Sequence, residues 1–150
     1  MSRGARRPSS MSTIGRTLVA GAGLSLAAGC AGGFEYVQSE SRVRLFRLEA
    51  GMPADSVRAV MGTEPMKYDR GIFQAGEIPN PWDEESHVIR GESVDILYYV
   101  THVREPDGRI ADDELTPLVL VQGRLAGWGW PFLDAFAERT GLVRTGPRPP

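Results

Sequence analysis

The clearest strand signal lies in the second half of the chain, from Val94 to Val103, where apolar residues occupy both sets of alternate positions. This pattern predicts a β-strand with two largely apolar sides. A second apolar stretch, Leu115–Val121, is joined by Gln122-Gly123 to a third, Arg124–Trp130, which predicts an antiparallel meander. One side of the first strand would carry Val94, Ile96, Tyr98 and Val100, and the other Leu97, Tyr99 and Val103.

A spacing of three and four residues between apolar positions predicts two helices before this sheet. The first covers Val43–Ala50, where Val43, Phe46 and Ala50 share a face flanked by Leu45 and Leu48; the same letters partly alternate, so a strand stays open. The second covers Ala54–Met61, between Pro53 and Gly62, with Val57 and Val60 directed towards the sheet. A third, short helix is expected over Phe132–Arg139, ending at Gly141.

The remaining segments are assigned from their turn residues. Met66–Tyr68 could begin a short strand, and Gly71–Gly91 is expected to be an ordered but irregular loop, with a mobile insertion as the alternative. Pro106-Asp107-Gly108 marks a turn. We expect an α+β domain over residues 43–141, a helical hairpin packed on a sheet of three or four strands, and a disordered tail over residues 142–150.

The helical hairpin carries a family resemblance. The run from Leu48 to Pro65, with Gly51-Met52, Val57 and Met61-Gly62, resembles the opening of the SmpA/OmlA (BamE-like) lipoprotein domain. Pro53 and Met61 depart from the usual residues of that family. The resemblance covers roughly residues 43 to 130 and implies a non-catalytic role in the cell envelope.

The N-terminus reads as an export signal. Four arginines and no acidic residue precede a short apolar run, Leu18–Leu26, which is too short to span a bilayer. The following Leu26-Ala-Ala-Gly-Cys30 resembles the lipobox of bacterial lipoproteins, which implies cleavage before Cys30 and its lipidation. A twin-arginine signal at Arg6-Arg7 and a start at Met11 are alternatives. Cys30 is the single cysteine, so an intramolecular disulfide is impossible.

Cleavage at this point divides the chain into a signal peptide (1–29), a lipidated cysteine with a flexible tether (30–42), the domain and its tail. Ala31, rather than Asp, follows the cysteine, which by resemblance to Gram-negative lipoproteins implies delivery to the outer membrane, facing the periplasm. Removal of four arginines leaves 13 basic and 19 acidic residues, a net charge of about −6. That charge argues against nucleic acid as a partner, and membrane contact is expected through the lipid alone.

Residues suited to catalysis are few. His87 and His102 belong to no zinc-binding or His-Glu-x-x-His pattern, and no Gly-x-Ser-x-Gly elbow, EF-hand or phosphate loop is found. We therefore expect no enzyme activity, no metal and no cofactor. The one enzymatic alternative is a small hydrolase that uses either histidine together with an acidic residue.

The most distinctive apolar surface is predicted on the sheet. Strict alternation places Ala126, Trp128 and Trp130 on one side of the last strand, opposite Leu125, Gly127 and Gly129. With Leu97 and Tyr99, the two tryptophans would either lie beneath the C-terminal helix or form a docking patch. The expected function is a membrane-anchored scaffold or assembly accessory that contacts an envelope protein; a periplasmic binding or inhibitor module is the alternative.

Overall fold

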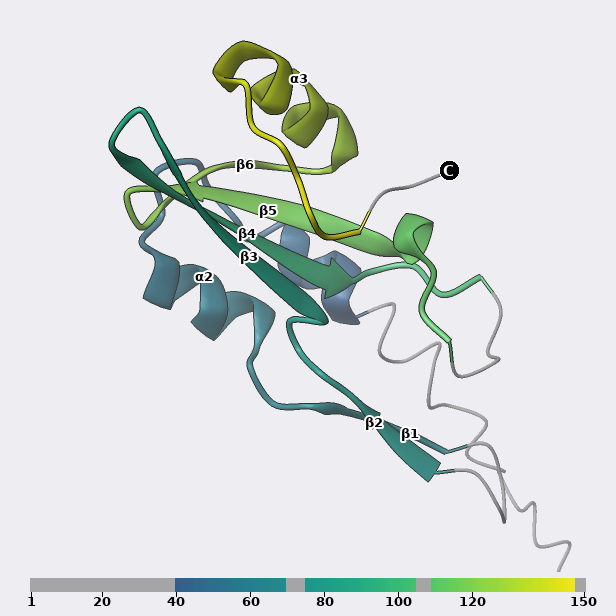
Figure 1. Ribbon diagram of the computed structural model, residues 1–150. Helices are drawn as coiled ribbons and strands as arrows, with labels where there is room; N and C mark the ends of the chain where they lie inside the picture. The colour runs from purple at the N-terminus through teal and green to yellow at the C-terminus, as the bar shows by residue number, and fades with distance from the viewer. Residues whose placement is uncertain (1–39, 70–74, 105–108, 148–150) are drawn as a thin grey trace, which may run out of the picture.

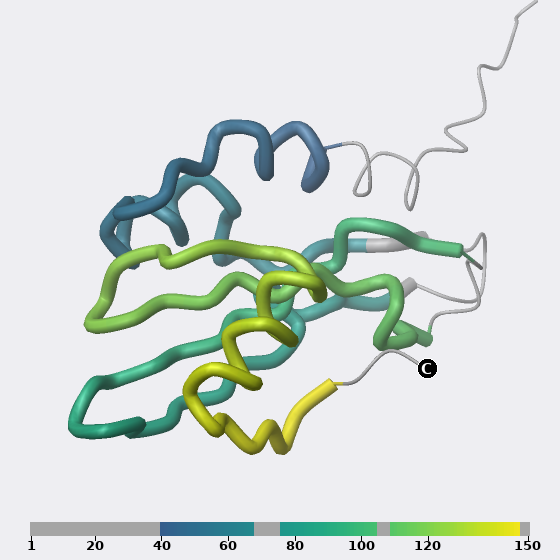
Figure 2. The backbone as a smooth tube through the Cα atoms, turned by 90° about the horizontal axis from the view of Figure 1, so that it is seen from above, coloured from purple at the N-terminus to yellow at the C-terminus, as the bar shows by residue number. Residues whose placement is uncertain are grey.

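The computed structural model describes residues 40–69, 75–104 and 109–147. A four-stranded antiparallel sheet lies at the centre (Figure 1). Seen from above, the beginning of the described chain and helix α2 lie on one side of the sheet, and helix α3 lies on the other (Figure 2). The structure confirms the α+β class, the small antiparallel sheet and the C-terminal helix.

The main sheet has the order β3-β4-β5-β6, so each strand pairs with its neighbour in sequence. Its strands are β3 (Asp83–Ile89), β4 (Glu92–Val100), β5 (Leu115–Val121) and β6 (Arg124–Trp128). β5 has the predicted bounds, whereas β4 and β6 end earlier than predicted. The predicted turn between β5 and β6 is confirmed. Gln122 and Gly123 both have positive φ, of 51° and 71°, which is the backbone geometry that lets a two-residue turn match the twist of the strands it joins.

The expectation of an irregular loop over Gly71–Gly91 is wrong for its described part, which contains two strands. β2 (Ala75–Ile78) pairs with β1 (Met66–Asp69) in a separate two-stranded sheet that projects beyond one end of the main sheet (Figure 1). β3 follows. Its inward position, Glu85, is a buried carboxylate, so the strand shows no apolar alternation in the sequence. The predicted Pro106–Gly108 turn lies outside the described residues.

Helix α2 (Ala54–Met61) has the predicted bounds and packs Val57 and Met61 against the sheet. The predicted helix over Val43–Ala50 differs from the structure. Residues 40–45 are helical, but residues 46–51 form turns and extended chain. We call residues 40–48 the N-terminal segment. Ser41 is buried within it, so the packed domain begins before the predicted boundary at residue 43.

The two sides of β4 face two separate hydrophobic clusters, which confirms the alternation predicted for residues 94–100. Val103, predicted beside Leu97 and Tyr99, packs instead against the cluster beneath α3, because β4 ends at Val100. Val94, Ile96, Tyr98 and Val100 lie in the cluster beneath α3 (Trp130–Thr140), which contributes Leu133 and Phe136. Leu97 and Tyr99 lie in the cluster beneath α2, together with Leu118, Leu120 and Leu125. As predicted, Val57 and the partly buried Val60 pack on the side that carries Leu118 and Leu120.

The close packing of α3 depends on Gly127 in β6. A β-carbon at this position would overlap the ring of Phe132, which is stacked on Phe136 with ring centroids 6.2 Å apart. The glycine thus admits an aromatic side chain of α3 against the backbone of the strand.

The chain after α3 also packs against the sheet. Leu142 is buried in the cluster beneath α3, and the backbone nitrogen of Thr145 donates a hydrogen bond of 2.8 Å to Glu85. We call residues 142–147 the C-terminal strap. The prediction of a disordered tail over residues 142–150 is therefore wrong for its described part, residues 142–147. A short 3₁₀ helix, η1 (Asp112–Glu114), precedes β5, and its buried Glu114 accepts hydrogen bonds from the backbone nitrogens of Arg104 and Ala111.

Candidate docking groove

An apolar groove lies between the N-terminal segment and the end of β6. It has a volume of about 580 Å³ and is lined by Arg42, Leu45, Phe46, Leu48 and Trp128. Leu48 is buried and Leu45 is half-buried, so these leucines form the floor. Phe46 is 90% exposed and stands at the rim.

Arg44 holds the N-terminal segment in place against α2. Its guanidinium donates a hydrogen bond of 2.6 Å to the carbonyl oxygen of Met61, the last residue of α2, and forms an ion pair of 2.6 Å with Glu40. The backbone continues in tight turns, with the nitrogens of Arg47 and Leu48 donating to the carbonyls three residues earlier. These contacts fix the inner wall of the groove.

Trp128 reaches the groove because β6 contains a β-bulge. Leu120 pairs with Leu125, but Val119 pairs with Gly127, so one extra residue of β6 lies between the two pairs. As a result Leu125 and Trp128 contribute to the same cluster beneath α2, although they are three residues apart. The strict alternation predicted for residues 124–130 is therefore wrong, because a bulge shifts the side-chain direction by one residue.

The structure does not bring the four predicted partner-binding residues onto one exposed face. Leu97 and Tyr99 are at most 1% exposed and lie beneath α2 and the N-terminal segment. Trp130 is the first residue of α3, on the opposite side, where its indole nitrogen donates a hydrogen bond of 2.8 Å to the carbonyl of Leu115. Only Trp128 lines the groove, where it is half-buried. Cys30 lies outside the described residues.

The residues of the N-terminal segment that line the groove were not predicted as a site. Leu45 and Leu48 were predicted only to flank a helical face formed by Val43, Phe46 and Ala50. In the structure that face points to solvent, and the two leucines point inward. The detectable signal was the pair of leucines three residues apart, on the same side of a helical turn.

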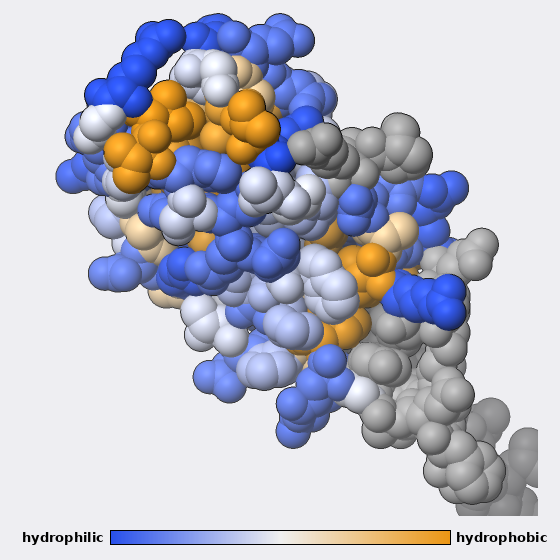
Figure 3. Space-filling model, in the orientation of Figure 1, coloured by the Kyte–Doolittle hydropathy of each residue, from blue (hydrophilic) through white to orange (hydrophobic). Residues whose placement is uncertain are grey.

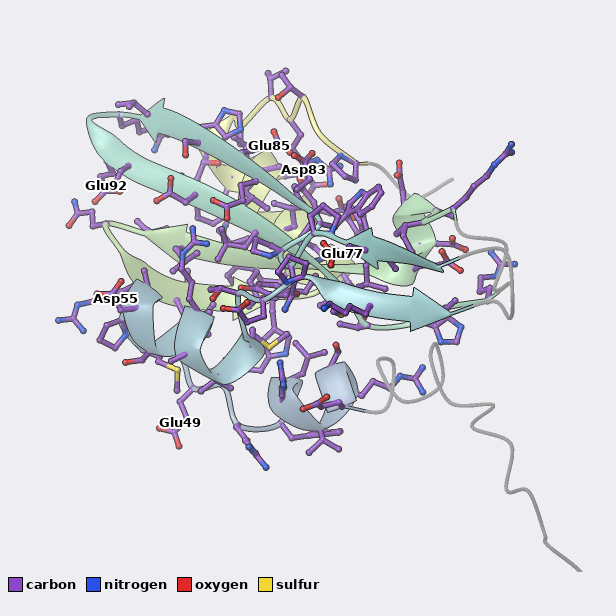
Figure 4. All side chains as sticks on the ribbon, turned by 90° about the horizontal axis from the view of Figure 1, so that it is seen from below. Glu49, Asp55, Glu77, Asp83, Glu85 and Glu92 are labelled. Atoms are coloured by element: carbon purple, nitrogen blue, oxygen red, sulfur yellow. The ribbon has the colours of Figure 1, made fainter. Side chains whose placement is uncertain are left out.

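Glu85 is the most strongly perturbed carboxylate in the described chain. Burial alone would raise its pKa, but hydrogen bonds from Tyr98, Thr145 and His87 outweigh burial and lower the pKa to about 2. The hydroxyl of Tyr98 donates to one carboxylate oxygen; the other accepts from Thr145 and lies 2.9 Å from Nε2 of His87. Figure 4 shows Glu85 beside the C-terminal strap, whereas Glu49 and Asp55 point away from the sheet.

This cluster fits a structural role better than a catalytic one. A general base works best when its pKa lies near the operating pH, and a carboxylate with a pKa of about 2 is a weak base at neutral pH. Both oxygens of Glu85 are already occupied by donors that fix the strap. His102 is elsewhere, with Nδ1 2.9 Å from the guanidinium of Arg42. The two histidines considered for hydrolysis are thus in separate hydrogen-bonded settings.

Within residues 40–69, 75–104 and 109–147, no three His, Cys, Asp or Glu side chains are grouped as metal ligands. In the same ranges, no helix is long and apolar enough to cross a membrane.

Comparison with known families covers the main sheet and the beginning of α3. The profile of the family described as "Protein of unknown function (DUF3192)" matches residues 31–134. The chain belongs to this family. The DUF3192 match begins at the residue after Cys30 and includes the N-terminal segment, α2, the whole sheet and Trp128. The search of curated proteins and the search of solved structures found no match.

Proposed function

We propose that this DUF3192 protein is a lipoprotein, anchored through lipid on Cys30 to the outer membrane and facing the periplasm. The observation that carries the proposal is Leu26-Ala-Ala-Gly-Cys30 at the end of a basic and apolar leader. Two features support it. Ala31 follows the cysteine, and the family match begins at that same residue.

We propose further that the domain is a non-catalytic scaffold or assembly accessory, as the resemblance to SmpA/OmlA domains implies. In this proposal the helical residues 40–45 and α2 form the helical hairpin of such a domain. Support comes from Gly51-Met52, the centre of the resemblance: the backbone nitrogen of Gly51 donates to the carbonyl of Leu125, and the nitrogen of Leu125 donates to the carbonyl of Met52. These bonds hold the connection between the two helices along the edge of β6.

The groove at Trp128 is the site that supports contact with an envelope protein best. It combines an apolar floor, an aromatic side chain that is only half-buried, and a cationic rim at Arg42. Tryptophan and arginine are enriched among the residues that dominate binding energy at protein interfaces. A partner would therefore insert an apolar side chain between Trp128 and Leu48.

The test is capture of partners by the lipidated protein from membranes solubilised in mild detergent. Trp128→Ala is expected to weaken capture by about 2 kcal/mol or more, roughly thirtyfold, because truncation to alanine removes most of the area that an interface tryptophan buries against its partner. Val88→Ala, at a position 79% exposed in β3, is the matched control and should leave capture unchanged.

Unchanged capture by a folded Trp128→Ala variant would exclude the groove as the docking site. A fall in melting temperature of several degrees would instead assign Trp128 to the core. The identity of the captured protein separates an assembly accessory, which should retain envelope assembly proteins, from an inhibitor module, which should retain an enzyme.

A further inference from the structure

Two large apolar side chains of the N-terminal segment face solvent. Phe46 is 90% exposed and Val43 is 53% exposed, although residues 40–45 are helical and packed on the domain. They are three residues apart, as are Leu45 and Leu48, which point inward. The segment thus has two apolar sides. The side of Leu45 and Leu48 packs on the domain, and the side of Val43 and Phe46 is exposed.

The same segment concentrates positive charge. Residues 40–48 contain three arginines and one acidic residue, Glu40, in a mature chain whose net charge is about −6. Arg44 is directed inward, to Met61 and Glu40. Arg42 and Arg47 are exposed and flank Val43 and Phe46 in the sequence, and the guanidinium of Arg42 also lies 2.9 Å from Nδ1 of His102. We call Arg42, Val43, Phe46 and Arg47 the basic ridge.

Two other exposed apolar side chains lack this combination. Val143 in the C-terminal strap is 75% exposed and Val88 in β3 is 79% exposed. On the face shown in Figure 3, apolar residues gather beside α3 and the β3–β4 turn, among predominantly polar neighbours. Neither Val88 nor Val143 belongs to the segment that continues from the proposed anchor.

The basic ridge is the part of the described domain nearest in sequence to Cys30. Glu40 follows Cys30 by ten residues, so the intervening chain spans at most about 36 Å even when fully extended. An anchored domain therefore meets the bilayer surface at a high effective concentration, and a weak contact is enough to keep it there. Exposed apolar and aromatic side chains flanked by arginines are the composition of segments that lie in a membrane interface.

We propose that the basic ridge rests on the lipid surface, with Val43 and Phe46 in the interfacial region and Arg42 and Arg47 at the level of the phosphates. This inference depends on the lipid anchor of the proposed function. It adds an orientation: the N-terminal segment faces the bilayer, the C-terminal strap faces away, and the groove at Trp128 opens beside the membrane. This contact goes beyond the contact through lipid alone that the net charge suggested, because the exposed Arg42 and Arg47 lie where the chain meets the anchor.

The test uses the lipidated mature protein in vesicles of equal parts phosphatidylethanolamine and phosphatidylglycerol. A polarity-sensitive fluorophore is attached to a cysteine introduced as Val43→Cys, or as Val88→Cys or Val143→Cys for comparison. A lipidated Cys30 has no thiol, so each chain takes one label. Two labels per chain would show that Cys30 is unmodified, and the anchor itself would then be refuted, separately from the orientation.

With one label per chain, the fluorophore at position 43 is expected to be quenched by spin labels on the lipid and protected from iodide in the water, whereas those at 88 and 143 are not. Phe46→Ser should lower the ratio of docked to undocked domain by about tenfold, as expected for one aromatic side chain leaving an apolar phase. Val88→Ser is the matched control and should leave the ratio unchanged.

Three results would overturn the proposal. Equal exposure of all three labelled positions to iodide would mean that the domain does not lie on the bilayer. Protection at position 43 that appears only after solubilised envelope proteins are added would assign the basic ridge to a protein partner. Protection that rises with the number of protein molecules per vesicle would assign it to a second copy of the chain.

Discussion

Glu85 joins three parts of the molecule through one side chain. It lies in β3, its carboxylate accepts from Tyr98 in β4, and it accepts from the backbone and hydroxyl of Thr145 in the C-terminal strap. Gly146 is close to the same carboxylate, so that a β-carbon there would overlap it. The three donor groups stabilise the charged form of this buried carboxylate. The attachment of the strap therefore depends on pH.

The expected effect follows from the direction of the pKa shift. The pKa of Glu85 falls from 4.5 to about 2 on folding, so its contribution to stability is complete above about pH 4.5 and is lost as the pH falls towards 2. Glu85→Gln should reduce the free energy of unfolding by about 1–3 kcal/mol at pH 5. Urea denaturation of both proteins should show this difference shrinking as the pH is lowered from 5.

Glu49→Gln is the control for this series, because Glu49 is exposed and points away from the sheet (Figure 4). It should follow the wild type at every pH. A Glu85→Gln difference that stays constant down to pH 3, or that is absent at pH 5, would refute the role given to the carboxylate.

Residue-level features were the hardest to predict from the sequence. A strand whose inward residues are Glu85, His87 and Ile89 carries no apolar period, and only the partners in β4 and the strap make the carboxylate acceptable in the interior. The bulge in β6 likewise leaves no mark in the sequence. The side of Trp128 is set by the pairing of Gly127 with Val119, a tertiary contact.

Helix α2 is the element that could be predicted most accurately from the sequence. Pro53 precedes it, Gly62 ends it with a φ of 86°, and its apolar residues recur at helical spacing. The ion pair between Arg58 and Glu84 of β3, at 2.7 Å, adds a connection to the sheet that the sequence did not reveal. The N-terminal segment could not be predicted as well, because it has apolar residues on two sides and only packing decides which side is inward.

Substitution on two sides of α2 tests its packing. Val57 is fully buried against Leu118 and Leu120, so Val57→Asp would bury an unpaired charge at a cost of several kcal/mol, enough to unfold a domain of this size. Ala59→Asp is the matched control on the exposed side of the same helix and should change stability by less than about 1 kcal/mol. Circular dichroism melts of the mature chain compare them. Similar melting temperatures for the two variants would contradict the observed orientation of α2.

For the whole molecule, local signals were sufficient for the meander and the flanking helices but not for the arrangement of layers. The sequence placed Leu97, Tyr99 and both tryptophans on one face beneath a C-terminal helix or open to solvent. In the structure α2 and the N-terminal segment cover Leu97 and Tyr99, and α3 covers the other face with Trp130. Which helix covers which side depends on contacts between distant residues, such as Phe132 on Gly127 and Arg44 on Met61.

The arrangement of charge is also a property of the whole chain. Three of the 13 basic residues that follow position 29 lie in the N-terminal segment, next to the proposed anchor, with one acidic residue, Glu40, whereas residues 30–150 as a whole are acidic. The proposed function and the proposed orientation both depend on the anchor, so they share the premise that the mature chain begins at a lipidated Cys30.

Mass spectrometry of the native protein, purified from membranes of the cells that express it, tests this premise most directly. We predict an N-terminus at Cys30 that carries a diacylglyceryl group on sulfur and an acyl group on nitrogen, and we predict that Cys30→Ser blocks both cleavage and lipid attachment. An unmodified Cys30, or an N-terminus at any other residue, would contradict the account.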